Sequence, residues 1–178
     1  MPGRTLHTIG HSTRSTDRLL ELLREAGITM LVDVRTIPRS RHNPQFDQAA
    51  LAPELARAGL EYHHLRTLGG LRRPREDSVN LGWRNASFRG YADYMQTEGF
   101  ARALAELETL AAARPTAIMC AEALPWRCHR SLIADALTIR GWRVLHLGIS
   151  PPGKAPTLHG PTSFLRTVEG WPVYPLPD

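Results

Sequence analysis

The chain alternates short apolar runs with longer segments of helical periodicity, and this alternation limits the folds that it can adopt. Residues 28–34 are apolar except at Thr29 and Asp33, as in a strand that is buried on both faces. The segment before them, residues 17–26, places leucines on one helical face and ends at Gly27. Together with a short β-type run at residues 6–9, these segments predict a parallel βαβ unit.

The same alternation continues to Leu147 and predicts the order of the whole fold. We expect strands over residues 6–9, 28–34, 60–65, 116–120 and 142–147. We expect helices over residues 17–26, 46–58 and 128–140, and residues 88–113 form either one long helix or two that divide near Gly99. The sequence therefore predicts an α/β fold with a single domain. Its mainly parallel sheet of about five strands has helices on both faces, as in a Rossmann-like three-layer sandwich.

The last part of the chain differs in composition. Residues 150–178 contain seven prolines and no sustained periodicity, so we assign residues 1–149 to the α/β domain and the remainder to a proline-rich segment that wraps on it. Phe164, Leu165 and Trp171 are the side chains expected to dock this segment, with a short helix over residues 162–168.

Length and cysteine content indicate the compartment. A chain of 178 residues fits one domain, and it has neither the run of ~20 apolar residues that crosses a bilayer nor the features of a signal peptide. Its two cysteines are too few for a disulfide scaffold. We therefore expect a cytoplasmic protein with no membrane partner, in which both cysteines are thiols available for catalysis, metal binding or packing. A disulfide bridge between the two cysteines is the alternative.

The formal net charge of +5 favours anionic partners. Lys154 is the single lysine, so the basic residues are almost all arginine, a residue suited to bidentate contacts with phosphate or carboxylate. Five of them lie in two loops that follow predicted strands: Arg39, Arg41, Arg72, Arg73 and Arg75. The expected partner is an anionic small molecule or a nucleic acid, although the same residues also suit a solvated surface.

Polar residues follow three of the predicted strands directly. His11 and Ser12 follow the first strand, and Asp33 and Arg35 lie at the end of the second. Cys120 ends the fourth. Because the carboxyl ends of neighbouring parallel strands meet at one edge of a sheet, where ligands of α/β proteins bind, we expect these side chains to line one crevice.

Both cysteines lie within residues 117–130. Cys120 is expected at the end of a strand, and Cys128 at the start of a helix, where the helix dipole would lower its pKa and make it the better thiolate. The two thiols can also act together as nucleophile and resolving thiol, or either can be a packed core residue. Cysteine phosphatases need an arginine at the position that Trp126 occupies, one step before Arg127, so the phosphatase interpretation is disfavoured.

The neighbouring polar residues supply candidate acids, bases and cations. Glu122 and Asp33 can serve as a general base or as partners that orient arginines, and His129 and His11 can transfer protons. For His11 the alternative is a turn cap, and for the carboxylates it is a structural ion pair. The arginines expected to bind the anion are Arg35, Arg41 and Arg130.

A metal site is only weakly indicated. Cys120, Glu122, Cys128 and His129 are of ligand types, but the chain contains no Cys-x-x-Cys pair of the kind that is typical of structural zinc sites. We therefore predict no metal and no other cofactor.

Several ordered motifs between Leu6 and Leu147 resemble the family labelled domain of unknown function 488. The segments that carry the resemblance are Thr8-Ile-Gly-His-Ser-Thr13, Asp33-Val-Arg35, Pro38-Arg-Ser-Arg41, Leu68-Gly-Gly70, Tyr91-Ala-Asp-Tyr-Met-Gln-Thr97, Cys120-Ala-Glu122 and Cys128-His-Arg130. The resemblance implies a compact α/β domain of bacterial or archaeal type, and it implies no particular activity.

The residues themselves favour an enzyme that acts on an anionic substrate, either phosphate-bearing or nucleotide-like, with a cysteine at a strand-to-helix turn as the reactive group. They do not distinguish a transferase from a hydrolase. Two alternatives remain open at this point: a non-catalytic nucleic-acid-binding module that uses the arginine loops, and a regulatory domain that binds a ligand in the same crevice.

Overall fold

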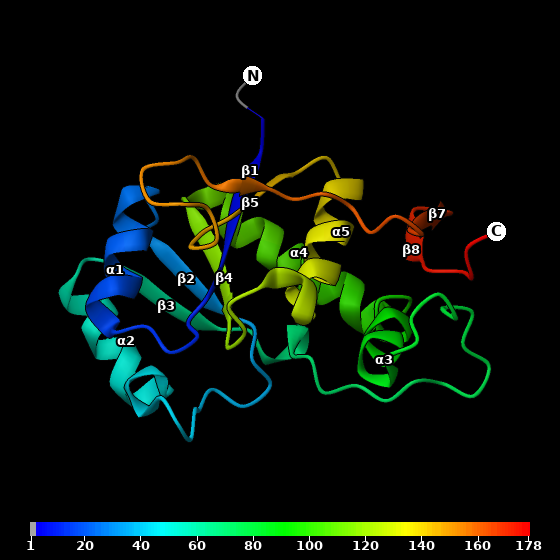
Figure 1. Ribbon diagram of the computed structural model, residues 1–178, viewed down its shortest axis with the longest axis horizontal. Helices are drawn as coiled ribbons and strands as arrows, with labels where there is room; N and C mark the ends of the chain where they lie inside the picture. The colour runs from blue at the N-terminus through cyan, green and yellow to red at the C-terminus, as the bar shows by residue number, and fades with distance from the viewer. Residues whose placement is uncertain (1–2) are drawn as a thin grey trace.

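The computed structural model describes residues 3–178 and confirms the single-domain α/β fold (Figure 1). Its strands are β1 (Thr5–Gly10), β2 (Met30–Asp33), β3 (Glu61–His64), β4 (Thr116–Cys120), β5 (Arg143–His146), β6 (Thr157–Leu158), β7 (Arg166–Val168) and β8 (Trp171–Val173). Its α-helices are α1 (Thr16–Glu25), α2 (Gln48–Arg57), α3 (Ala86–Tyr94), α4 (Glu98–Ala113) and α5 (Arg130–Ile139). Short 3-10 helices are η1 (Pro44–Phe46), η2 (Arg66–Leu68) and η3 (Pro125–Arg127). None of the helices in this range is long and apolar enough to cross a membrane.

The main sheet within residues 3–178 has six strands in the order β3-β2-β4-β1-β5-β6. The five predicted strands are all present and parallel to one another. The sequence does not predict β6, a two-residue strand that pairs antiparallel with β5 at the edge. Since β4 lies between β2 and β1, its last residue, Cys120, is central at the carboxyl edge of the sheet, opposite Gly10 of β1.

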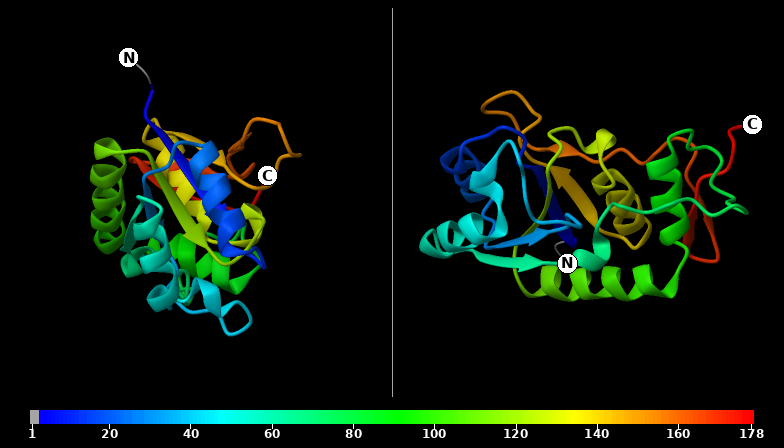
Figure 2. Two further views of the ribbon diagram at one scale, coloured as in Figure 1. Left: turned by 90° about the vertical axis from the view of Figure 1, so that its left-hand side faces the viewer. Right: turned by 90° about the horizontal axis from the view of Figure 1, so that it is seen from below.

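Helices cover both faces of this sheet, which confirms the three-layer arrangement (Figure 2). Successive residues of a strand point to opposite faces, and β2 shows the consequence. Leu31 packs in one core with Leu23 of α1 and Leu55 of α2. Val32 packs in the other core with Leu104 of α4, together with α3 and α5. Both cores exclude water, so the sheet is buried on its two faces as its apolar strands require.

The helix boundaries differ from the predicted ones where polar side chains or turns intervene. Of the two alternatives for residues 88–113, the structure has two helices, and α4 begins after Thr97, whose side-chain oxygen accepts a hydrogen bond from the Phe100 N–H. The helix predicted from Cys128 begins at Arg130, because η3 precedes it and Cys128 itself has an extended backbone. Cys128 therefore lies before the helix and not in its first turn.

The helix predicted over residues 162–168 is wrong. This part of the chain instead forms a hairpin in which β7 and β8 pair antiparallel, with Val168 opposite Trp171. The two residues between them, Glu169 and Gly170, both have positive φ angles, of 51° and 83°. Two consecutive positive φ angles are the condition for the tight hairpin turn that matches strand twist, so the turn overrides any helical preference of the preceding residues.

The C-terminal segment lies along the top of the view in Figure 1 and ends beside α3. Tyr174, which is completely buried, anchors it to two parts of the domain. Its hydroxyl donates to Asp135 Oδ2 on α5 at 2.8 Å, and its N–H donates to Asn80 Oδ1 at 2.9 Å. Asn80 belongs to the irregular loop of residues 69–85, so the tail holds that loop against α5.

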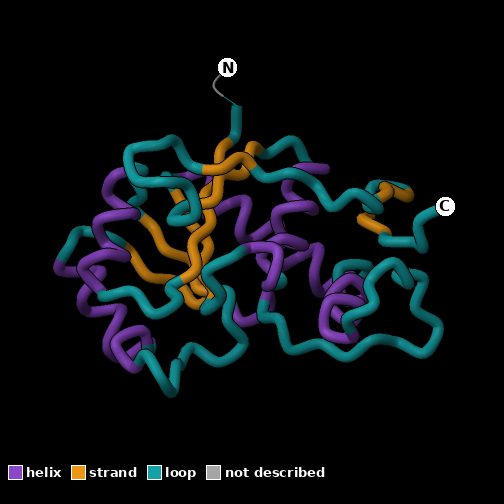
Figure 3. The backbone as a smooth tube through the Cα atoms, viewed as in Figure 1, coloured by secondary structure: helices purple, strands orange, loops and turns teal. Residues whose placement is uncertain are grey.

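The carboxyl ends of the parallel strands lie at the lower edge of the same view. Figure 3 shows that the loops after β2 and after η2 run along this edge. The turn from β4 to α5 reaches the same place. The fold therefore brings the segments that hold most of the predicted site residues to one edge of the sheet.

Candidate functional site

The two cysteines meet at the carboxyl end of β4. The chain returns through η3, and the Sγ atoms of Cys120 and Cys128 lie 2.7 Å apart. Both residues are buried free thiols. Gly10 makes this turn possible, since a Cβ there would lie 1.6 Å from the carbonyl oxygen of Glu122. Two residues that are eight positions apart in the sequence thus form one dithiol.

His129 contacts this dithiol through Cys128. Its Nδ1 lies 3.4 Å from the Cys128 Sγ, and its Nε2 lies 2.9 Å from the carbonyl oxygen of Val34. Because a carbonyl oxygen only accepts, Nε2 carries the proton and Nδ1 is left as an acceptor that faces the thiol. Burial lowers the pKa of His129 to about 4, against the raising effect of the Val34 hydrogen bond, so the ring is neutral near neutral pH.

Arg130 places a buried positive charge behind the thiols. Its side chain is fully buried. Its Nη2 donates to the carbonyl oxygens of Glu122 at 2.9 Å and Ala123 at 3.2 Å, and its Nη1 donates to Thr8 Oγ1 at 3.1 Å. Within residues 3–178 no carboxylate forms an ion pair with it, and its Nε has no partner. A buried cation without a carboxylate is costly and favours an anion nearby.

Thr8 continues the polar chain from Arg130 into the domain. Its hydroxyl lies 2.6 Å from His146 Nδ1, His146 Nε2 lies 3.0 Å from His159 Nδ1, and His159 Nε2 lies 2.7 Å from Asp135 Oδ1. With Asp135 as acceptor at one end and Arg130 as donor at the other, each group between them donates once and accepts once. Burial, the neighbouring His159 and the charge of Arg130 lower the pKa of His146 to about 3, which keeps this ring neutral.

These surroundings give the two thiols opposite acidities. Burial alone would raise the pKa of Cys120, but the hydrogen bond from the Cys128 thiol and the charge of Arg130 bring it below its usual value. Burial raises the pKa of Cys128 well above its usual value, and its hydrogen bond with Cys120 and the charge of that thiol raise it further. These directions run against the expectation that Cys128 is the better thiolate, and they favour Cys120 as the thiol that ionises.

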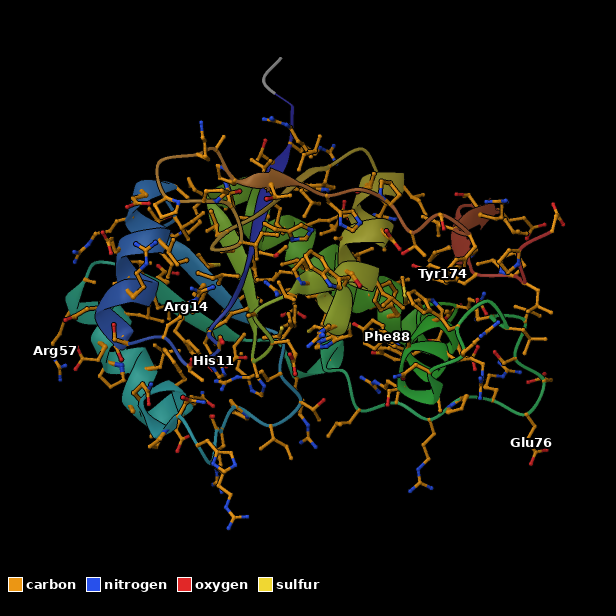
Figure 4. All side chains as sticks on the ribbon, in the orientation of Figure 1. His11, Arg14, Arg57, Glu76, Phe88 and Tyr174 are labelled. Atoms are coloured by element: carbon orange, nitrogen blue, oxygen red, sulfur yellow. The ribbon has the colours of Figure 1, made fainter. Side chains whose placement is uncertain are left out.

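A cavity of about 480 Å³ adjoins the dithiol. The predicted site residues that line it are Arg35, Cys120, Glu122, Cys128 and His129. Arg39 and Arg127, both exposed, add positive charge to its wall. Ile37, Leu71 and Phe88 add apolar surface, and Phe88 lies on the side of α3 that faces the sheet (Figure 4). The cavity thus combines a thiolate with cationic and apolar walls.

Asp33 and Arg35 form a structural unit beneath this cavity. Arg35 donates from Nε to Asp33 Oδ1 at 2.9 Å and from Nη2 to Oδ2 at 2.7 Å, and both side chains are buried. Tyr62 donates its hydroxyl to Asp33 Oδ2, and Arg35 Nη2 also donates to the carbonyl oxygen of Phe46. Most of the hydrogen-bonding capacity of Asp33 and Arg35 is thereby used inside the protein. This arrangement corresponds to the structural ion pair expected from the sequence as the alternative to a general base.

Three other predicted residues lie outside the cavity wall. His11 stacks on Phe46 with ring centroids 4.5 Å apart, and it lies beyond the end of β1 in Figure 4. Its Nδ1 lies 2.9 Å from the carbonyl oxygen of Ser12, and burial lowers its pKa. Ser12 has a φ of 48°, in the left-handed region, and serves the turn after β1. Arg41 is exposed in the loop after β2 and does not line the cavity.

The sequence profile of the family described as domain of unknown function DUF488 matches residues 15–137, which is more than half of the chain. The chain belongs to this family. No curated protein and no solved structure matches the chain. The DUF488 match is narrower than the resemblance between Leu6 and Leu147, yet it contains both cysteines, His129, Arg130 and Asp135.

The polar chain behind Arg130 crosses the limits of the DUF488 match. Thr8, His146 and His159 lie outside residues 15–137, and sequence reasoning did not identify any of them as part of the site. One signal was present in Asp135, the single carboxylate among the buried residues of α5, which is otherwise apolar from Leu132 to Leu137. The others meet only because β1 pairs with β5, with Thr8 opposite His146.

The part of the chain that the structure describes contains no group of three or more His, Cys, Asp or Glu residues that could hold a metal ion. Glu122 is exposed and directs its backbone carbonyl, rather than its carboxylate, to Arg130. The contacts that bring Cys120, Cys128 and His129 together are the one between the two thiols and the one between the Cys128 thiol and the His129 ring.

Proposed function

We propose that this DUF488 protein is an enzyme that uses Cys120 as a nucleophile on an anionic substrate. The observation that carries the proposal is the buried guanidinium of Arg130, which has no carboxylate partner within the described residues and lies behind the thiol whose pKa is lowered. A thiolate at Cys120 supplies the missing negative charge. Thiolates are the reactive form of cysteine, so the same pairing activates the nucleophile.

The neighbouring groups have distinct roles in this proposal. Cys128 donates its S–H to the Cys120 thiolate, and the two sulfur atoms are 2.7 Å apart. His129, held neutral with Nδ1 as acceptor, is the group that can take or return a proton at Cys128. Glu122 is exposed at the cavity and is available as an acid or base toward the substrate.

The proposed substrate is an anion, phosphate-bearing or nucleotide-like, bound by the cavity of about 480 Å³. Arg39 and Arg127 supply positive charge at the wall, and neither forms an ion pair with a carboxylate of the described residues. Phe88 and Leu71 supply surface for an apolar or aromatic part of the same molecule. The two free thiols suit a reducing compartment, and we place the enzyme in the cytoplasm.

Alkylation tests this proposal directly. Native protein is treated with iodoacetate, an anion, and with iodoacetamide, which is neutral, and the modified cysteine is identified by peptide mass spectrometry. Cys120 is expected to react first, with a midpoint pH below the ordinary thiol pKa of about 8.5. The proposal fails if both thiols stay unmodified in the native protein, or if Cys128 reacts first.

A charge variant separates anion binding from thiol reactivity. Arg127→Gln is expected to slow iodoacetate roughly 2- to 5-fold relative to iodoacetamide, the size expected from one exposed charge. Arg24, exposed on α1 and outside the cavity wall, provides the matched control Arg24→Gln, for which the ratio stays unchanged. If the ratio of the iodoacetate rate to the iodoacetamide rate is the same in the two variants, Arg127 does not contribute to anion binding.

A further inference from the structure

The second thiol has no obvious use in a simple nucleophilic enzyme. A hydrolase or transferase needs one nucleophile, and a hydroxyl or a backbone N–H is enough to stabilise a thiolate. Here the partner is a second cysteine on the same cavity wall, with its Sγ 2.7 Å from that of Cys120. A disulfide bond of about 2.05 Å between them needs only a small movement of the side chains.

We infer that Cys120 and Cys128 are a two-electron redox pair, and that the substrate is an anionic low-molecular-weight disulfide which this pair reduces. The inference rests on the proposed function, because Cys120 remains the attacking nucleophile. It adds the chemical class of the reacting group, which is a sulfur–sulfur bond, and it assigns Cys128 as the resolving thiol.

In the first step the Cys120 thiolate attacks one sulfur of the substrate disulfide. The substrate S–S bond breaks, a mixed disulfide forms between Cys120 and one half of the substrate, and the other half leaves as a thiolate that takes a proton from solvent. Arg39 and Arg127 on the cavity wall attract the anionic substrate to the thiol.

In the second step Cys128 resolves the mixed disulfide. Its proton passes to His129 Nδ1, 3.4 Å away, and its sulfur attacks Cys120 Sγ. The bond between Cys120 and the substrate half breaks, the Cys120–Cys128 disulfide forms, and the departing thiolate takes the proton from His129. Overall one substrate disulfide becomes two thiols, and the protein dithiol supplies the two electrons. A low-molecular-weight thiol in excess reverses the oxidation and restores the dithiol.

The charges at the site favour this order of events. While Cys120 is a thiolate, its charge and its hydrogen bond raise the pKa of Cys128 and hold the resolving thiol protonated. The mixed disulfide removes that negative charge, whereas Arg130, which lowers the pKa of Cys128, remains. Cys128 therefore becomes more acidic at the stage at which it must attack.

Arg130 also affects the equilibrium between the two redox forms. The disulfide has no thiolate, so oxidation leaves the buried guanidinium without an anion beside it. A reduced form that is stabilised by its charge partner makes a dithiol pair more oxidising. The pair is thus expected to be readily reset by thiols, and its dithiol is a weaker reductant than an unperturbed one, so the substrate disulfide must be in excess over thiol to drive the oxidation.

The test uses glutathione disulfide as the anionic probe and cystamine, a cationic disulfide, as the comparison, with intact mass as the readout. Wild-type protein is expected to lose two hydrogens and to retain no adduct. Cys128→Ser is expected to keep one glutathione on Cys120, and Cys120→Ser to react more slowly by roughly 10-fold or more. Glutathione disulfide is expected to react faster than cystamine, and Arg24→Gln to behave as wild type.

The outcomes separate this inference from the proposed function. If Cys120 is alkylated as expected but wild-type protein retains glutathione and never forms the internal disulfide, the redox pair is refuted and the nucleophile stands. If cystamine reacts as fast as glutathione disulfide, the anionic substrate class is refuted. If Cys120 resists both alkylation and glutathione, both proposals fail. Cys128→Ala, checked by circular dichroism, replaces Cys128→Ser if the serine variant does not fold.

Discussion

Replacing Thr8 by valine tests the polar chain that supports Arg130. Valine keeps the shape and the strand preference of threonine but removes a hydroxyl that accepts from Arg130 Nη1 at 3.1 Å and contacts His146 Nδ1 at 2.6 Å. Thr8, Arg130 and His146 are all buried, so water cannot replace the lost bonds. Each buried group left without a partner costs about 1–3 kcal/mol, and more if it is charged. Thr8→Val is therefore expected to lower the free energy of unfolding by about 2–5 kcal/mol.

Urea unfolding followed by circular dichroism measures this loss, with the slope m expected to stay unchanged. Thr138→Val is the matched control, because the Thr138 hydroxyl donates only to the Ala134 carbonyl oxygen within α5. That variant is expected to change stability by less than about 0.5 kcal/mol. A loss below about 1 kcal/mol for Thr8→Val would refute the argument that the hydroxyl joins Arg130 to His146.

Three further predictions concern the dithiol, the pH and the ion pair. Cys128→Ala removes the S–H donor that lowers the pKa of Cys120, so the midpoint pH for alkylation of Cys120 is expected to rise; an unchanged or lower midpoint contradicts this. Because the pKa of His129 is lowered from 6.5 to about 4, the unfolded chain binds the extra proton between these values, and stability falls as pH decreases through this window. Urea unfolding at several pH values measures how steeply the free energy of unfolding changes with pH in this window. His129→Asn is expected to reduce that slope by up to about 1.4 kcal/mol per pH unit. An equal slope in wild type and variant argues against a neutral His129 ring in the folded protein. Asp33→Asn breaks the buried pair with Arg35 and is expected to lower the free energy of unfolding by about 3–5 kcal/mol, whereas a loss near zero means that the pair does not support the loop after β2.

The parallel sheet could be predicted because each of its elements is specified by a pattern of neighbouring residues in the sequence. Each strand is a short apolar run, each helix has one apolar face, and their alternation admits few topologies. The hairpin of β7 and β8 was not predictable in the same way, because its determinant is the backbone conformation of Glu169 and Gly170 and not a hydrophobic pattern. The start of α5 was misplaced by two residues because η3 holds the chain in a turn before Arg130.

The residue types of the site could also be predicted, but their ionisation could not. Their position in the turn after β4 identifies Cys120, Cys128 and His129 as site residues, but their spacing does not require the two thiols to meet, and it is the structure that brings them into contact. The acidity of the thiols depends on the burial of Arg130 and on which sulfur donates to the other. These are properties of three-dimensional packing, as is the chain from Thr8 to Asp135, whose members come from two strands, a helix and the C-terminal segment.

We propose Cys120 as the thiolate of the dithiol, and a pH titration of the cysteine Cβ resonances in isotope-labelled protein measures the ionisation of each thiol separately. Cys120 is expected to titrate below the ordinary thiol pKa of about 8.5 and Cys128 above it. Titration of Cys128 before Cys120, or of both thiols above that value, would contradict it.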